Sequence, residues 1–464
     1  MAAGVGGRRR ESIRGALGRD PGWCCVALAL LGLSLFSVLP VFGQGIGLRG
    51  IGPVNESMAG AATGSPIDST GALYWNPASI SGLPASDMSF GLGLILPSSQ
   101  LHSRIDAGAL GPGIPPMTFA GASSSEPGIV PVPSMAMVRK VEGSPWTYGL
   151  GMFAIGGCRV NYPASPFPAL TSNPILTPQP PLGLGLGRLS ANFDLMQIVP
   201  TVSYDVNRHL SIGFAPTVTL AQVVVSPMFL APFDDANGDG FSTYSRGLGT
   251  RYAWGGGFQV GAYYTTDVGW HFGLSFKSQQ WMEDFRFRTE DELGAPRDST
   301  FDLDYPMIIS LGASYTGFEN WVLACDVRYF DYANTPGFGK GGFAADGALT
   351  GLAWENLVSV ALGVQRRLSE RWFVRAGYCY NDNPILAGAA QFNVASPLVI
   401  QHTVHVGLSY CFDDNWICAV AYTHAFENDV SGPMVFPGLG PLPGTEVGSK
   451  ASADSLSIGV SKRF

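Results

Sequence analysis

The chain has 464 residues and a formal net charge of −8, and only 13% of its residues are Asp, Glu, Lys or Arg. Globular domains usually contain about 25% of these four residue types, and the mean hydropathy here is +0.18. Nucleic-acid binding depends on clustered positive charge, so the composition excludes that function class. An apolar, weakly charged chain points instead to a membrane.

The N-terminus has the order of a secretory signal peptide. An apolar run over residues 23–42 ends in Val41-Phe42-Gly43, a small-residue cleavage pattern, and is preceded by five basic residues, Arg8, Arg9, Arg10, Arg14 and Arg19. An uncleaved membrane anchor is the alternative, because about 20 apolar residues span a bilayer. Removal of residues 1–43 would change the net charge from −8 to −11.

Beyond residue 43 no window reaches the roughly 18 uninterrupted apolar residues of a transmembrane helix. Segments of alternating polarity recur instead, and many are long enough for a tilted strand to cross a membrane. About fourteen are expected, an even number as single-chain bacterial barrels have. They cover residues 87–97, 132–141, 146–157, 189–206, 209–224, 251–265, 269–289, 301–317, 320–335, 354–368, 370–382, 400–412, 415–428 and 451–464.

The connections between these segments alternate between short and long. Short ones include residues 207–208 and 369–370, and long ones include 98–131, 225–250 and 429–450. Outer-membrane barrels have short periplasmic turns and long extracellular loops. We therefore expect an all-β, transmembrane antiparallel barrel in the bacterial outer membrane, with both chain ends on the periplasmic side.

The last segment illustrates the two faces of such a wall. Leu456, Ile458 and Val460 alternate with Ser457 and Gly459. The apolar set suits lipid, and the small set leaves room in the lumen for a conduit or an inserted plug. The same pattern recurs over residues 358–365.

Residues 44–85 do not have the pattern of a strand. They are rich in Gly, Ala and Ser, with Asn55, Ser65 and Asp68 as candidate helix caps. We expect a signal peptide at 1–43, a partly helical hatch plugging the lumen at 44–85, and the barrel at 86–464. A disordered periplasmic tail is the alternative for the hatch segment.

Several ordered blocks resemble the FadL/TodX family of outer-membrane transporters for long-chain fatty acids and aromatic hydrocarbons. They include Trp75-Asn76-Pro77-Ala78, Gly273 to Ser278, Tyr305 to Tyr315, the block 354–384 and the terminal Phe464. The resemblance implies a fourteen-stranded barrel with an N-terminal hatch. It also implies lateral release of cargo at a kink in the third strand.

The resemblance carries over to two segments of this chain. Asn76, Pro77 and Ala78 match the hatch segment that moves to open the route. Tyr148, Gly149, Leu150 and Gly151 match the third-strand kink, and glycine inside a strand permits a bulge. Alternatively, Gly149 and Gly151 are simply small residues that face a crowded lumen.

Three cations are expected to face inward, and two of them match basic positions of the family. Lys277 and Arg375 could pair with a substrate carboxylate, as could Arg328. The alternative for Arg328 is a structural network with Asp326. A hydrocarbon cargo would need no counter-charge.

The segment from Asp235 to Thr243 begins like a calcium loop. Asp235, Asn237 and Asp239 occupy alternate positions before Gly240, but Arg246 stands where a bidentate Glu belongs. A weak calcium site and an ordinary polar loop both remain open, and no other cofactor is expected. Cys411 and Cys418 flank a tight turn symmetrically, so a cross-strand disulfide or two reduced, buried thiols are possible.

The most consistent function is passive uptake of hydrophobic molecules, and the chain is not expected to be an enzyme. The alternatives are a general diffusion porin and an outer-membrane lipid hydrolase, although no G-x-S-x-G or H-E-x-x-H motif occurs. Expected partners are a hydrophobic small molecule, outer-membrane lipid and lipopolysaccharide, and the barrel-assembly machinery through Phe464. The chain is expected to be a monomer.

Overall fold

The computed structural model describes residues 45–111 and 117–464. The expected signal peptide lies outside the described residues. Among the described residues, no helix is both long enough and apolar enough to span a membrane.

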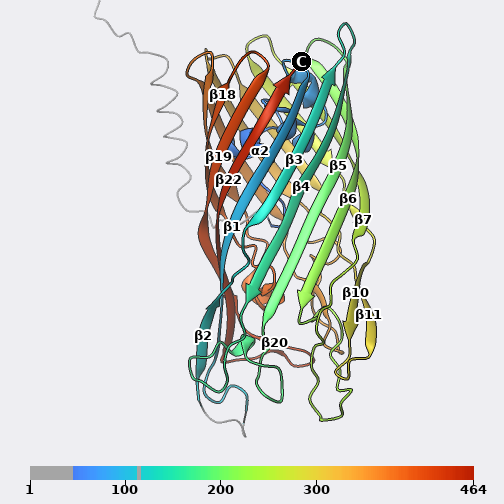
Figure 1. Cartoon of the computed structure of the whole chain (residues 1–464), viewed down its shortest axis with the longest axis vertical. Helices are drawn as coiled ribbons and strands as arrows, with labels where there is room; N and C mark the ends of the chain where they lie inside the picture. The colour runs from blue at the N-terminus through green and yellow to red at the C-terminus, as the bar shows by residue number, and fades with distance from the viewer. Residues whose placement is uncertain (1–44, 112–116) are drawn as a thin grey trace, which may run out of the picture. The chain divides into compact units, whose positions relative to one another are not determined.

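Fourteen antiparallel strands close into a barrel, in which each strand pairs with its neighbours in chain order and the first pairs with the last (Figure 1). The strands are β1 (Asp87–Ile105), β3 (Val130–Lys140), β4 (Trp146–Tyr162), β5 (Leu189–Asp205), β6 (Leu210–Ser226), β7 (Ala253–Thr265), β8 (Trp270–Lys277), β12 (Ile308–Tyr315), β13 (Trp321–Phe330), β16 (Leu357–Arg367), β17 (Trp372–Asn381), β18 (His402–Cys411), β19 (Trp416–Gly432) and β22 (Thr445–Arg463). The predicted barrel is confirmed.

The long connections carry short elements of their own. These are β2 (Phe119–Ser124), β9 (Trp281–Met282), β10 (Phe285–Glu290), β11 (Pro296–Phe301), β14 (Gly341–Phe343), β15 (Leu349–Leu352), β20 (Val435–Phe436), β21 (Gly440–Pro441), η2 (Pro174–Leu176), η3 (Ala387–Ala389) and η4 (Gln391–Asn393). β2 pairs with the C-terminal end of β1 and so extends the wall past the first residue of β3 on the extracellular side.

The expected single strand over residues 269–289 was wrong, because it is broken between β8 and β9. Gln280 turns inward there, and its Oε1 accepts hydrogen bonds from Thr217 at 2.6 Å and from Gln197 at 3.1 Å. The following strand also starts later than expected, at Ile308. Long-range polar contacts set both ends, and local periodicity does not encode them.

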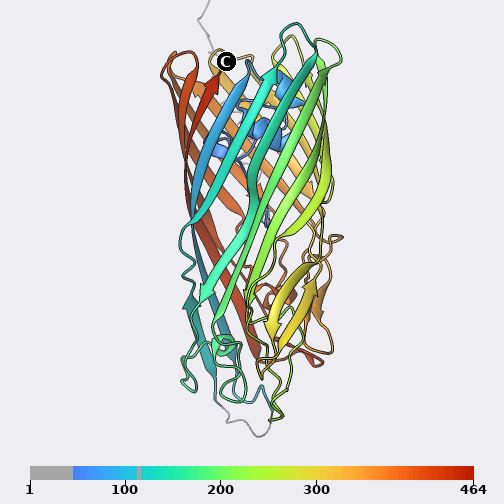
Figure 2. The same cartoon turned by 45° about the vertical axis from the view of Figure 1, so that its right-hand side comes forward.

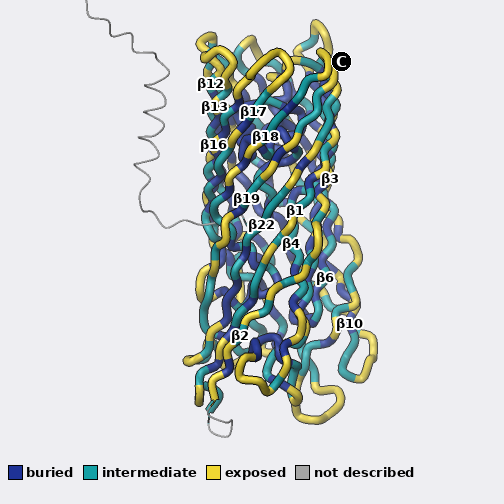
Figure 3. Tube along the Cα trace, turned by 60° about the vertical axis from the view of Figure 1, so that its left-hand side comes forward, coloured by how far each residue is buried: buried dark blue, intermediate teal, exposed yellow. Residues whose placement is uncertain are grey.

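The two faces of the wall differ as predicted. Leu456 and Ile458 are 46% and 56% exposed, whereas Ser457 between them is 1% exposed. Figure 3 shows exposed and buried residues alternating along the strands. The outward residues form the apolar surface that a barrel presents to lipid.

The hatch occupies the lumen near the end of the barrel that carries the short turns (Figure 2). It contains α2 (Gly52–Ser57), α3 (Ser69–Trp75) and η1 (Ser79–Gly82). Of the three candidate caps, Asp68 caps α3 by accepting the N–H of Gly71 at 3.3 Å. Asn55 lies inside α2 instead, where its Oδ1 accepts the N–H of Ile51.

A ring of inward glycines, which we call the glycine belt, surrounds the hatch. A Cβ atom added to Gly312 would lie 2.4 Å from Asp326 Oδ1 and 2.5 Å from the backbone nitrogen of Gly64 in the hatch. Contacts of the same kind occur around the wall at Gly91, Gly213, Gly261, Gly273, Gly363, Gly377, Gly407 and Gly459. The small inward residues therefore make room for the plug.

Candidate functional site

A cavity of about 180 Å³ lies beneath the extracellular loops. Five long connections contribute to it, together with the far end of β1. Its apolar lining is Ile105, Pro174, Ile175, Pro180, Leu184, Leu186, Phe229, Phe233, Phe343, Leu349, Phe392, Val394, Met434, Val435, Phe436 and Pro437. An apolar cavity of about 150 Å³ holds one benzene molecule, so this one accommodates a small aromatic ring.

Three polar side chains of the cavity, Gln179, Tyr244 and Gln391, form hydrogen bonds within the protein. Gln179 exchanges hydrogen bonds with the backbone of Tyr244, and the Tyr244 hydroxyl donates to the carbonyl of Gly347 at 2.6 Å. Gln391 bonds in the same way to the backbone of Val435. Among the described residues, no Asp, Glu, Lys, Arg or His lines the cavity. The cavity therefore offers contacts to an uncharged, apolar molecule.

On the periplasmic side of this cavity, the wall is interrupted between β3 and β4. The two strands pair only up to Ser134 opposite Phe153, although β4 continues to Tyr162. Two prolines, Pro131 and Pro133, precede this point in β3 and cannot donate to a ladder. In the described part of the chain, no barrel strand pairs with β4 on this side between Ala154 and Val160.

A bulge in β4 lies at this gap. Ala154 pairs with Met196 and Gly156 with Leu195, so Ile155 is an extra residue opposite β5. Gly157 has a φ of +155°, and a side chain there would collide with the carbonyl of Phe193. The bulge thus depends on glycine and turns the edge of β4 out of the regular ladder.

The start of the hatch covers the gap from inside. Leu48 donates its N–H to the carbonyl of Ile155 at 2.9 Å, and Gly157 donates to the carbonyl of Ile46 at 3.2 Å. Gly47 faces Gly156 as an isolated β-bridge. The segment Ile46, Gly47 and Leu48 therefore supplies hydrogen bonds that a barrel strand would otherwise make.

The kink expected at Tyr148, Gly149, Leu150 and Gly151 is displaced. These residues pair regularly with β3 on one side and with β5 on the other, so the ladder is unbroken there. The irregularity lies at Ile155, beyond the point where β3 stops pairing. The adjacent pair Gly156-Gly157 was the sequence signal that could have located it, but nothing in the sequence indicated Ile46 to Leu48.

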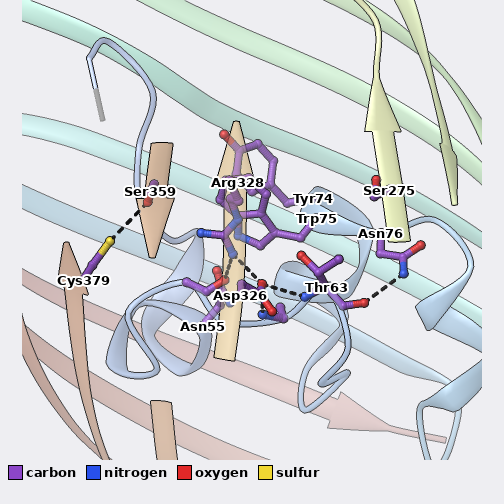
Figure 4. Close-up of polar contacts among 12 residues, drawn as sticks. Asn55, Thr63, Tyr74, Trp75, Asn76, Ser275, Asp326, Arg328, Ser359 and Cys379 are labelled. Carbon is purple, nitrogen blue, oxygen red and sulfur yellow. Dashed lines mark hydrogen bonds and ion pairs between the residues drawn. The ribbon is translucent and has the colours of Figure 1, made fainter. Parts of the chain in front are cut away.

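Asn76, Pro77 and Ala78 lie against β5, β6 and β7, the strands that follow β4 around the wall. The Asn76 side chain is fully buried, and its Nδ2 donates to the carbonyls of Thr63 at 2.8 Å and Ala262 at 3.0 Å. Its Oδ1 accepts the N–H of Ala78 at 3.0 Å. Figure 4 shows Asn76 beside Thr63 in the hatch. These contacts fasten the hatch to the wall.

Arg328 and Asp326 also hold the hatch to the wall. This is the structural network with Asp326 that was the alternative for Arg328. Asp326 Oδ2 accepts hydrogen bonds from the N–H groups of Ala62 and Thr63, both at 2.9 Å (Figure 4). The Arg328 guanidinium donates to Asp326 at 2.6 Å and lies 3.5 Å from the centre of the Trp75 ring. Both charged groups thus contact the hatch, while Asp326 Oδ1 and Arg328 Nε and Nη1 have no hydrogen-bond partner among the described residues.

The other two expected cations also contact the hatch region and do not line the extracellular cavity. Lys277 Nζ donates to the carbonyl of Tyr74 at 3.3 Å and lies over the Tyr74 ring. Arg375 donates to Gln365 and Ser409, both at 2.7 Å, in a separate polar cavity on the periplasmic side that Asp68 also lines. In the part of the chain that the structure describes, none of these three cations lines the extracellular cavity.

The expected calcium loop is closed by its own hydrogen bonds. Asp235 accepts the N–H of Gly240, and Asn237 and Asp239 accept backbone N–H groups two residues later. Glu292 from the β10–β11 hairpin bonds to Asn237. Within the described ranges, no three acidic, His or Cys side chains are arranged to hold a metal ion.

The two cysteines of the β18–β19 hairpin are not opposite each other. Cys418 pairs with Tyr410, and Cys411 pairs with Ile417, so the register is offset by one residue. Side chains one residue apart point to opposite faces of the wall. Both thiols are free, as the thiol alternative expected, but they are half-buried, so the expected placement opposite each other and the expected burial were wrong.

The chain was compared with known families and solved structures. Residues 185–464 match the model of the outer membrane protein transport protein family (OMPP1/FadL/TodX). No curated protein sequence matches the chain.

Among solved structures, the chain is similar to the toluene transporter TodX of Pseudomonas putida, with 15% identity, coverage of 90% of this chain and 99% of that one, and a TM-score of 0.64. A FadL homologue of Pseudomonas aeruginosa gives 14% identity, coverage of 91% and 99%, and 0.66. The toluene transporter TbuX of Ralstonia pickettii gives 17% identity, coverage of 90% and 99%, and 0.62. At these identities the likeness establishes the fold. With its closed fourteen-stranded barrel and a family match over more than half its length, the chain belongs to the FadL/TodX family of outer-membrane transport proteins.

Proposed function

We propose that the protein is a passive channel for small, uncharged hydrophobic molecules, and that it performs no catalysis. The observation that carries the proposal is the extracellular cavity, whose lining is mostly apolar and whose side chains Gln179, Tyr244 and Gln391 are already bonded within the protein. A carboxylate placed there would lose its hydration without gaining a partner, which is costly. An aromatic hydrocarbon has no charged group, so it would not pay this cost of lost hydration.

The proposed route runs through one cluster of buried apolar side chains, which includes Ile175 at the cavity and Ile155 at the wall gap. Phe285 and Phe287 lie buried on the lumen side, and Phe193 lies 6.1 Å from Phe285, ring centre to ring centre. The backbone of Phe193 contacts Gly157 in the bulge. The cargo therefore meets aromatic or aliphatic surface along the proposed route.

Lateral release into the membrane is the proposed outcome. Transfer of an apolar molecule from water to lipid gains about 0.8 kcal/mol per buried methylene, so the channel needs no energy source. We place the movable gate at Ile46, Gly47 and Leu48, which cover the gap through two backbone hydrogen bonds. Asn76, Pro77 and Ala78 then hold the rest of the hatch in its seat.

The proposed cargo also agrees with two of the similar structures, which are of toluene transporters. A long-chain fatty acid is the second candidate, and it is less favoured because the basic side chains Lys277, Arg328 and Arg375 are all bonded at the hatch level.

Deletion of Ile155 tests the route. Ala154 and Gly156 already pair with consecutive residues of β5, so the deletion removes the bulge without shifting the register. We expect the rate of toluene uptake into cells to fall at least tenfold. The barrel should still fold, as measured by the heat-dependent shift of its mobility on a gel. Ile155→Val is the control, because it keeps the bulge and should keep at least half of the uptake.

The same assay distinguishes the alternatives. Toluene uptake by the wild type should exceed uptake of a long-chain fatty acid, and small sugars should not pass. Full toluene uptake by the Ile155 deletion would exclude lateral release here. Rapid passage of sugars through the wild type would show a diffusion porin instead.

A further inference from the structure

Three arginines form a patch on the outer surface of the barrel, outside any route for cargo. Arg251 precedes β7, and Arg286 and Arg288 lie on β10, which pairs alongside residues 248–251 through backbone hydrogen bonds. All three side chains are exposed. Within the described part of the chain, their guanidinium groups make no hydrogen bond or ion pair. The patch is therefore free to bind an anion.

The patch lies on the extracellular side of an aromatic surface that marks the membrane boundary. Tyr252, Trp254 and Trp281 are 61%, 53% and 55% exposed and are close together, because Glu283 donates its N–H to the carbonyl of Trp254 at 2.8 Å. Aromatic girdles of barrels lie at the membrane interface. Since β7 ends toward the short periplasmic turns, its start at Ala253 is at the extracellular interface. β10 projects from the barrel at the same end (Figure 1).

Two carboxylates line a cavity with two of the arginines, and a third, Asp298, lies opposite Arg288 in the β10–β11 ladder. A surface cavity of about 290 Å³ is lined by Arg251, Tyr252, Glu283, Asp284 and Arg286. Cations alone would suit any anionic headgroup. A headgroup that carries a phosphate together with hydroxyl and amide donors would satisfy both the arginines and the carboxylates.

We propose that this patch binds the phosphorylated glucosamine headgroup of a glycolipid of the outer leaflet. The phosphate accepts hydrogen bonds from Arg251, Arg286 and Arg288, and the sugar hydroxyl and amide groups donate to Glu283 and Asp284. The acyl chains lie along Tyr252, Trp254 and Trp281. Glycerophospholipids fit less well, because they present few donors to the carboxylates. The inference requires only that the chain spans the outer membrane, and does not depend on the transported cargo.

Native mass spectrometry of the full-length mature protein in detergent tests this site with bisphosphorylated lipid A as the probe. The variant Arg251→Gln/Arg286→Gln/Arg288→Gln should bind lipid A at least tenfold more weakly than the wild type. Arg366→Gln is the matched control, because Arg366 is an exposed arginine that lies over Trp321 near a periplasmic turn. It should bind lipid A as the wild type does.

Two further probes identify the chemistry. Enzymatically dephosphorylated lipid A should bind at least tenfold more weakly than lipid A to the wild type, and so should phosphatidylglycerol. Equal binding of lipid A by the triple variant and the wild type, or equal binding of dephosphorylated lipid A, would overturn the site. Equal binding of phosphatidylglycerol would overturn the glycolipid assignment. Toluene uptake into vesicles without lipid A should be the same for the triple variant and the wild type.

Discussion

The carboxylate of Asp326 lies 2.6 Å from the guanidinium of Arg328, and both side chains are completely buried where the hatch meets the barrel wall. The pair lies on β13, and both members also bond to hatch backbone, Asp326 to Ala62 and Thr63 and Arg328 to Gly60. The ion pair on the wall thus holds three backbone groups of the plug.

Removal of one partner should loosen the hatch. Asp326→Ala would leave a buried, uncompensated guanidinium, and breaking a buried pair in this way costs about 3–5 kcal/mol. We expect frequent opening events in single-channel recordings in planar bilayers, where the wild type stays closed. The neutral double variant Asp326→Asn/Arg328→Gln is the control and should leak less than Asp326→Ala. Equal conductance of Asp326→Ala and the wild type would contradict this role for the pair.

The glycine belt gives a second prediction about the hatch. Gly312→Ala would place a Cβ atom 2.4 Å from Asp326 and 2.5 Å from Gly64, and overpacking of this kind costs about 1–3 kcal/mol. The variant should increase cleavage of the hatch by an added protease in outer-membrane vesicles opened to the periplasmic side. Gly256→Ala is the control, because a Cβ atom there has no neighbour nearer than 3.7 Å. If both variants are cleaved equally, the belt does not seat the hatch.

The apolar cavity predicts a strong effect of a single charge. Met434 is 3% exposed and lines the cavity, so Met434→Lys would place an ammonium group where the lining has no partner for it. Toluene uptake should fall at least tenfold, measured against Met434→Leu, which keeps the volume and the apolar character. Unchanged toluene uptake by Met434→Lys would show that cargo does not pass through this cavity.

The sequence predicted the barrel because its main signal is local. Alternation of Leu456, Ser457 and Ile458 reports which face of one strand meets lipid, and no other part of the chain is needed. The number of strands followed from the same pattern, and the plug was expected because residues 44–85 lack it.

The site could not be predicted in the same way, because it depends on contacts between distant segments. The gap exists because β3 stops pairing at Ser134, and its cover comes from Ile46 to Leu48, about 110 residues before Ile155. Lys277 and Arg328 had the right charge for a carboxylate, but only the fold reveals that the hatch contacts both. The cavity is assembled from five loops that have no common motif.

Asp68 should make the stability of the hatch depend on pH. Burial raises the pKa of its carboxyl group from 3.8 to about 6, although the N–H of Gly71 favours the ionised form. Between these two values the folded protein binds more protons than the unfolded chain, so stability falls as the pH rises through this window. The full change is about 3 kcal/mol, at 1.36 kcal/mol per pKa unit.

Urea titrations of the protein in lipid vesicles between pH 3.5 and 7.5 measure this effect. The wild type should unfold at lower urea concentration as the pH rises from about 4 to about 6, beyond any change in a matched variant. Asp68→Asn is that variant, because it keeps an oxygen to accept the Gly71 N–H and cannot ionise. The difference between the two proteins should therefore be small at pH 3.5 and largest above pH 6. A wild type that gains stability relative to Asp68→Asn as the pH rises would mean that Asp68 is ionised in the folded hatch, held by the Arg375 guanidinium that shares its cavity.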